Sequence, residues 1–321
     1  MSRRPRVLCM VDLSGAPDAV ETLNWVAEVD YCPSDRESLL QSIHNYDAFW
    51  VHVDLKIDQI VLERAKRLKV INTASTGTDH IDKEEVARRG IRLLSISSDY
   101  ELLDRFTATA ECAWMLQLAC HRHLRAAVSH VLAGGWQGHL FSGQQLSDCT
   151  LGVLGVGRLG RMVCHYGQAF RMQVLGCDLK TFEIPGVRSV DFDTLLQESD
   201  AISIHIHMEP QNYHLFDNGA FGKMKDGAIL VNTSRGDIID ETALIRALQS
   251  GKLAAFGTDV LHDEWRKDIS ESPVVQYAQN HDNVVITPHM GGASETSIWS
   301  ARSFSAKKLA HFLETGQELT M

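Results

Sequence analysis

Residues 151–160 have the sequence LGVLGVGRLG, and this stretch decides how the middle of the chain folds. An apolar run typical of a buried strand leads directly into Gly155, Gly157 and Gly160, which have the GxGxxG spacing. In such a motif the first glycine makes a tight turn, the second lets a pyrophosphate approach, and the third lets helix and strand pack closely. Apolar residues then recur at helical spacing as far as Phe170. The pattern predicts a dinucleotide-binding strand, turn and helix.

A lone GxGxxG also occurs in ordinary turns, so the residues that follow it matter. Residues 173–177 form a second predicted strand that ends in Asp178, eighteen positions after Gly160. An acidic residue about 20 positions after the glycines is expected to bind the adenosine ribose hydroxyls. A carboxylate there repels a 2′-phosphate, which favours NAD over NADP. The alternative is that Asp178 is a solvent-facing residue at a strand end.

Short apolar runs alternate with helical patterns along the rest of the chain. Further buried strands are predicted at residues 7–11, 48–53, 70–71, 91–96, 201–206, 228–231, 254–258 and 284–287. Ser34 and Glu37 form a capping-box pattern, Asp82 is expected to cap a helix ending at Gly90, and one long helix is predicted over 106–128. Alternation of this kind implies parallel sheets covered by helices. The predicted fold class is α/β, with two doubly wound domains.

The composition excludes several classes of protein. Of the 321 residues, 44% are hydrophobic and 22% are charged, as in an ordinary globular protein. The formal net charge of -10 argues against a broad surface for nucleic acid or anionic membrane, although a local arginine can still bind an anionic substrate. The seven cysteines contain no CxxC pair, which indicates free thiols rather than disulfides or a metal cluster. No signal-peptide core or membrane span is apparent, so a cytoplasmic location is expected.

Three polar segments begin at the ends of predicted strands, where open parallel sheets bind their ligands. They are NTSRGD at 232–237, TDVLHDE at 258–264 and TPHMGG at 287–292. Together they offer the guanidinium of Arg235, the carboxylate of Glu264 and the imidazole of His289. A guanidinium can clamp a carboxylate, a histidine can exchange a proton near neutral pH, and a carboxylate can orient that histidine. The set suits hydride transfer to a 2-keto acid, whereas each residue alone is more often an ordinary surface or packing residue.

These motifs resemble the D-isomer-specific 2-hydroxy-acid dehydrogenase family over essentially the whole chain. The resemblance implies a flavodoxin-like substrate domain formed by residues 1–105 and 294–321, around a Rossmann domain at 106–293. It implies that Arg235 binds the substrate carboxylate and carbonyl, and that His289, supported by Glu264, is the acid/base. The expected cofactor-binding residues are Gly155, Gly157, Arg158, Leu159, Gly160, Asp178, Thr233, Asp259 and Gly292. Thr76 and Gly77 are expected to bind the substrate through backbone amides.

The implied activity is NAD-dependent interconversion of a D-2-hydroxy acid and a 2-keto acid, by a homodimer without a metal. Several positions depart from the family pattern, among them His80, His207, Glu209 and Trp265, and the loop between Glu264 and His289 is longer than usual. These departures leave the identity of the substrate open. An alternative function is that of an NAD-sensing corepressor, because such proteins resemble this family and can retain the same three residues.

Overall fold

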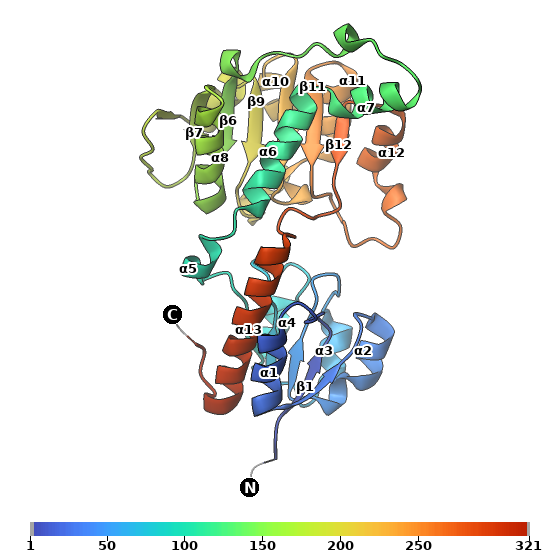
Figure 1. Ribbon diagram of the computed structural model, residues 1–321, viewed down its shortest axis with the longest axis vertical. Coiled ribbons are helices and arrows are strands. Elements are labelled where there is room, and N and C mark those ends of the chain that lie inside the picture. The colour runs from blue at the N-terminus through green and yellow to red at the C-terminus, as the bar shows by residue number, and fades with distance from the viewer. Residues whose placement is uncertain (1–2, 320–321) are drawn as a thin grey trace. The chain divides into compact units, whose positions relative to one another are not determined.

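The computed structural model describes residues 3–319, which form two compact units. The first unit contains the described residues up to Phe106 together with those from Ser294 onward, and the second contains Thr107–Ala293. Figure 1 shows that the chain leaves the first unit once and returns to it through the final helix.

The first unit is built on a five-stranded parallel sheet with the order β2-β1-β3-β4-β5. This is the flavodoxin-like order of a doubly wound sheet. The strands are β1 (Arg6–Cys9), β2 (Glu28–Tyr31), β3 (Ala48–Trp50), β4 (Val70–Asn72) and β5 (Arg92–Leu94). The helices are α1 (Pro17–Val26), α2 (Arg36–Ser42), α3 (Gln59–Arg64), α4 (Lys83–Arg88), α5 (Tyr100–Leu103) and α13 (Glu295–Thr315).

Helix α13 belongs to the core of this unit although it lies at the other end of the sequence. It packs beside α1 (Figure 1), and Ala306 and Leu309 are fully buried with Leu23 of α1 and the strand residues Val7 and Cys9. Burial of a leucine or valine side chain contributes about 1.5–3 kcal/mol. The apolar face of the last helix therefore completes the core under the first strand.

The second unit is built on a seven-stranded parallel sheet with the order β12-β11-β10-β9-β6-β7-β8. Its central part has the Rossmann order, which reverses direction between β6 and β9. The strands are β6 (Thr150–Leu154), β7 (Gln173–Cys177), β8 (Val187–Ser189), β9 (Ala201–Ile204), β10 (Ala228–Asn232), β11 (Leu253–Thr258) and β12 (Val284–Ile286).

Helices cover both faces of this second sheet (Figure 1). One apolar cluster joins the sheet to α6 (Ala108–His121) and α8 (Arg158–Ala169). The other joins it to α9 (Phe192–Glu198), α10 (Asn218–Lys223), α11 (Glu241–Gln249) and α12 (Pro273–Asn280). Both units thus have the predicted α/β architecture.

Two strands escaped the sequence prediction for the same physical reason. Strands β2 and β8 lie at sheet edges, and most of their side chains are exposed. An apolar run detects a strand that is buried on both faces, and these two exposed edge strands have no such run.

The prediction of a single helix over 106–128 is wrong. Helix α6 ends at His121, and a separate helix α7 (Leu124–Leu132) begins after His123, which has a left-handed backbone with φ of 49°. Neither glycine nor proline marks this break, so no local signal predicts it.

The two predicted helix caps had different outcomes. Asp82 accepts a hydrogen bond from the Glu85 backbone N–H at 2.9 Å, and Gly90 has φ of +69°, which confirms the predicted start and end signals. The Ser34 cap is wrong, because Asp35 caps α2 by accepting from the Ser38 N–H. The Ser34 hydroxyl donates instead to Asp54 at 2.7 Å.

A buried ion pair fixes α13 to the segment after β5. The ammonium of Lys308 donates to Asp99 Oδ2 and to the Ser95 carbonyl, both at 2.8 Å, and the two side chains are 1% and 8% exposed. A charge in such a place is stable only with its partner, because desolvation costs several kcal/mol per ion.

We predict that Lys308→Ala lowers the free energy of unfolding of this unit by about 3 kcal/mol, because it leaves the Asp99 carboxylate buried and unpaired. Lys223→Ala is the matched control, since Lys223 pairs with Asp193 at an exposed surface site, where such pairs contribute about 0–1 kcal/mol. Urea unfolding followed by circular dichroism measures both. Equal shifts for the two variants would contradict a stabilising role for the buried pair.

Candidate active site

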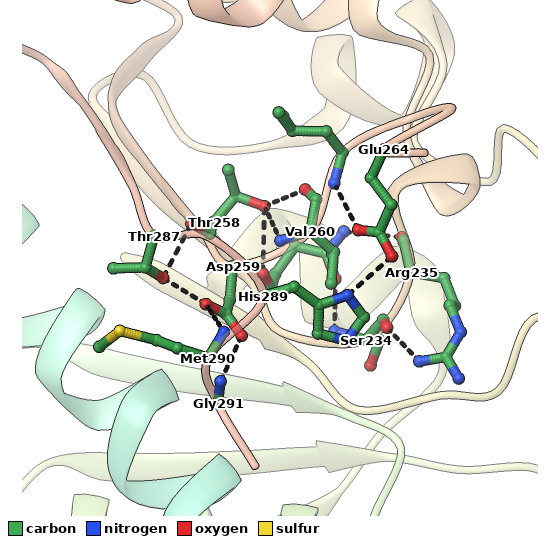
Figure 2. Close-up of polar contacts among 12 residues, drawn as sticks. Ser234, Arg235, Thr258, Asp259, Val260, Glu264, Thr287, His289, Met290 and Gly291 are labelled. Atoms are coloured by element: carbon green, nitrogen blue, oxygen red, sulfur yellow. Dashed lines mark hydrogen bonds and ion pairs between the residues drawn. The ribbon is translucent and has the colours of Figure 1, made fainter. Parts of the chain in front are cut away.

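Three loops of the second unit meet at the carboxyl ends of β10, β11 and β12, which are neighbouring parallel strands. Arg235 follows β10, Glu264 follows β11 and His289 follows β12. Figure 2 shows these three side chains grouped with the polar residues that hold their loops. Parallel strands end at the same edge of a sheet, which is why segments far apart in sequence converge here.

His289 and Glu264 are in direct contact. His289 Nδ1 lies 2.7 Å from Glu264 Oε1, with the imidazole half-exposed and the carboxylate largely buried. The hydrogen bond that His289 donates to Glu264 raises the pKa of His289 above its usual value, with the Glu264 and Asp259 charges adding to this effect, while burial and the charge of Arg235 oppose it. The long loop between the two residues therefore does not separate them.

Asp259 holds the loop that carries His289. Its Oδ1 accepts from the Thr287 hydroxyl at 2.5 Å and from the Met290 N–H at 2.9 Å, and its Oδ2 accepts from the Gly291 N–H at 2.7 Å. His289 itself has φ of 49°, a left-handed conformation that costs a non-glycine residue about 1–2 kcal/mol. The bonds to Asp259 on both sides of His289 stabilise that conformation.

The loop before Arg235 is fixed by the last residue of β10. Asn232 accepts from the Ser234 N–H at 2.9 Å and donates to the Arg235 carbonyl at 2.8 Å, while the Ser234 hydroxyl donates to the Ile204 carbonyl. The Arg235 guanidinium donates to the Ser234 carbonyl at 2.7 Å and lies near enough to oppose protonation of His289. A guanidinium in this place suits an anionic group bound beside the imidazole.

The glycine motif has the geometry of a pyrophosphate cradle. Gly155 has φ of +90°, and a Cβ there would lie 2.5 Å from the His205 carbonyl oxygen. A Cβ on Gly160 would lie 1.9 Å from the Gly155 carbonyl oxygen, so only glycine lets the helix start so close to the strand. A Cβ on Gly157, in contrast, would meet no atom within 4 Å, which leaves open space at the N-terminus of α8.

Asp178 lies at the end of β7 and is attached to the glycine loop. Its Oδ2 accepts from the Val156 N–H at 2.7 Å, and its Oδ1 accepts from the Lys180 N–H at 2.8 Å. The carboxylate thus stabilises the turn as well as placing a negative charge beside it. Each oxygen keeps a further lone pair with which it could accept from a ribose hydroxyl.

The other expected cofactor residues lie in the same unit. The Thr233 hydroxyl is buried and has no hydrogen-bond partner among the described residues, as expected of a group that awaits a ligand. Leu159 packs on the apolar cluster beneath α8, which leaves its backbone as the part available to a cofactor. Arg158 begins α8, and Gly292 is exposed after the His289 loop. These features fit a bound dinucleotide.

Thr76 and Gly77 lie in the first unit, in the loop between β4 and α4, and so are not among the residues that the second unit brings together. Their loop is ordered internally, since the Ser75 hydroxyl donates to the Gly77 carbonyl at 2.6 Å. His80, one of the departures from the family pattern, is buried.

Sequence reasoning missed the residues that hold the loops together, namely Thr287, Asn232, Asp237, Glu241 and His262. All five lie in or next to the three polar segments, yet nothing in their spacing shows which ones bond across loops.

Within residues 3–319, no group of three or more His, Cys, Asp or Glu could hold a metal ion. No helix in that same range is both long and apolar enough to span a membrane.

Residues 114–291 match the model of the D-isomer specific 2-hydroxyacid dehydrogenase NAD binding domain. The chain is 35% identical over 262 residues to a hydroxypyruvate reductase of Thermotoga maritima, covering 81% of this chain and 82% of the relative. It belongs to the D-isomer specific 2-hydroxyacid dehydrogenase family, whose central domain binds NAD.

Other relatives and solved structures agree with this membership. A D-3-phosphoglycerate dehydrogenase of Archaeoglobus fulgidus is 37% identical over 263 residues, which are 81% of this chain and 48% of that protein. The chain spans about half the length of the phosphoglycerate dehydrogenases it matches, 48% and 55%. The structure of D-lactate dehydrogenase from Aquifex aeolicus complexed with NAD and lactic acid has a TM-score of 0.84 at 29% identity, covering 96% of this chain and 95% of that one. The corepressor alternative is not favoured by these relatives.

The position and charge of Asp178 lead to a prediction of cofactor preference. We predict that the chain binds NADH more tightly than NADPH, and that Asp178→Asn narrows the ratio of the two Kd values. Removing the charge takes away repulsion on the order of 1 kcal/mol, roughly fivefold in affinity. Asparagine is preferable to alanine because it can still accept from the Val156 N–H.

Titration calorimetry measures both dinucleotides, with Asp193→Asn as a surface control at the start of α9. An unchanged ratio in Asp178→Asn would show that this carboxylate does not face the 2′-position of the ribose.

Proposed function

We propose that this chain is an NAD-dependent oxidoreductase that interconverts a D-2-hydroxy acid and its 2-keto acid. The observation that carries the proposal is the 2.7 Å contact between His289 and Glu264 beside the Arg235 guanidinium. Bound nicotinamide would accept or supply the hydride. We further propose that Thr76 and Gly77 bind the substrate through backbone amides of their loop.

The protein groups divide the remaining work. Arg235 would clamp the substrate carboxylate with two parallel N–H donors and polarise the adjacent carbonyl. His289 would hold the proton that the carbonyl oxygen receives in reduction, and would accept it again in oxidation. Glu264 would keep Nδ1 occupied, so that Nε2 is the nitrogen available for this transfer.

The test of the Arg235 assignment is Arg235→Lys. Lysine keeps the charge but lacks the planar fork, so we expect a loss of about 2–3 kcal/mol of transition-state binding, on the order of 30–150-fold in kcat/KM. Steady-state assays with a panel of 2-keto acids and NADH measure it. Arg188→Lys, at a surface ion pair with Glu198, is the control. Near wild-type kcat/KM in Arg235→Lys would mean that this residue is not the clamp.

The acid/base assignment predicts a specific pH behaviour. Glu264 stabilises the imidazolium, so reduction, which uses protonated His289, should persist to higher pH because of it. Oxidation uses neutral His289, so its rate should rise with pH through the same ionisation. In Glu264→Gln the pKa of His289 falls. The alkaline limb of the pH profile for reduction and the acidic limb of the profile for oxidation should therefore both move to lower pH.

Profiles of kcat/KM report the ionisations of the free enzyme and are the measurement to make. His289→Ala should abolish most turnover in both directions. If both limbs of the pH profiles stay in place in Glu264→Gln, Glu264 does not act on the ionisation of His289.

We also propose that the chain is a cytoplasmic homodimer. Helix α7 has no buried residue, and exposed apolar side chains recur along it and the segment that follows, namely Leu124, Val128, Val131, Leu132, Trp136 and Leu140. So many exposed apolar side chains in one stretch of a folded unit favour an interaction site there. All seven cysteines are free thiols, as is usual in a reducing compartment.

A double variant, Val128→Asp with Leu132→Asp, should shift the sedimentation coefficient from that of a dimer to that of a monomer. Ile60→Asp, at an exposed apolar position on α3 of the other unit, should leave it unchanged. A wild-type chain that sediments as a monomer at micromolar concentration would refute the dimer.

A further inference from the structure

The loops after β10 and β11 are joined at a second place, outside the contact between His289 and Glu264. The backbone of Gly236 packs directly on the peptide between Leu261 and His262. A Cβ at position 236 would lie 2.0 Å from the Leu261 carbonyl carbon and 2.2 Å from the His262 nitrogen. No side chain fits there, so the two loops approach as closely as their backbones allow.

His262 is held at three points across this contact. Its Nδ1 hydrogen-bonds the carboxylate of Asp237, its backbone N–H donates to Glu241 Oε1 at 3.2 Å, and its carbonyl accepts from the Arg266 guanidinium. Arg266 Nε also donates to the Asp263 carbonyl at 2.9 Å, and Asp263 has a left-handed backbone with φ of 47°. Asp237, Glu241 and Arg266 are therefore the charged groups that face His262.

The positions of these residues connect the two sides of the candidate site. Asp237 follows Arg235 by two residues, and His262 precedes Glu264 by two. The backbone nitrogen of Leu261, the residue before His262, lies 3.5 Å from Glu264 Oε2, at the limit of a hydrogen bond. A displacement of His262 would move the Glu264 side relative to the Arg235 side.

Stability alone does not account for these contacts of His262, which together we call the His262 clamp. The His262 and Asp237 side chains are 47% and 42% exposed, and surface pairs of this kind contribute about 0–1 kcal/mol. A displacement of about 1 Å at a reacting group can cost on the order of 100-fold in rate. The geometric effect of the clamp is thus expected to exceed its effect on unfolding.

We propose that His262 is a positioning residue, which through Asp237 and Glu241 fixes the distance between the Arg235 loop and the Glu264 loop. The expected effect of His262 on the reaction rate rests on the function proposed above. The expected effect of His262 on the alignment of Glu264 with His289 does not rest on that function.

The test compares His262→Ala with His262→Asn, which keeps an N–H donor at a similar distance from the backbone. The matched control is His165→Ala, because His165 is an exposed histidine of the same unit with a side-chain hydrogen bond to Gln168. His262→Ala should lose about 10- to 100-fold in kcat/KM, with a larger rise in KM for the keto acid than for NADH. His262→Asn should recover most of this loss.

Two further readouts separate positioning from a merely structural role. The His289 imidazole, titrated by NMR, should show a pKa in His262→Ala that falls toward that of Glu264→Gln, because Glu264 is no longer held against it. The urea midpoint of His262→Ala should match that of His165→Ala. Asp237→Ala should reproduce the His262→Ala losses, and the double variant should be no worse than either, since the pair acts as a unit.

An unchanged His289 titration and unchanged kinetics in His262→Ala would overturn the proposal. A loss of activity that only parallels a loss of stability would overturn it as well. If the wild-type chain reduces no 2-keto acid, the proposed function fails, while the NMR titration still decides whether His262 aligns Glu264 with His289.

Discussion

Both carboxylate oxygens of Asp259 accept hydrogen bonds from the segment that carries His289, and the candidate site depends on this attachment. Asp259 itself directly follows β11, so the position of the imidazole is set by the sheet rather than by its own exposed loop. The left-handed conformation of His289 would otherwise relax, since it is unfavourable for a residue with a Cβ. Groups built on rigid elements keep their geometry better than groups on free loops.

Close backbone approaches form the second constraint. At Gly160 and at Gly236 a methyl group would lie 1.9 Å and 2.0 Å from main-chain atoms, far inside van der Waals contact. The first approach sets the helix against the cofactor strand, and the second sets the Arg235 loop against the Glu264 loop. Both halves of the site are thus aligned by main chain, whose position side-chain rotation cannot change.

Hydrophobic runs predicted the interior of both sheets well, because strands buried on both faces are continuously apolar. They missed β2 and β8 at the sheet edges, and no glycine or proline announced the left-handed His123 that divides α6 from α7. In the candidate site, the order of residues along the chain was enough to predict that Arg235, Glu264 and His289 follow the ends of strands. The bonds of Asp259, Asn232 and His262 were not, because they join residues 2 to 32 positions apart whose pairing exists only in the folded sheet.

The discontinuity of the first unit has a consequence for biosynthesis. Synthesis runs from the N-terminus, so every residue of Thr107–Ala293 is polymerised before α13 is made. Until then the face of α1 around Leu23, and the strand residues beneath it, lack Ala306, Leu309 and the ammonium of Lys308 that neutralises Asp99. The part of the protein synthesised first is therefore the last to become stable, and a nascent chain stalled before Ser294 would present an apolar surface to chaperones.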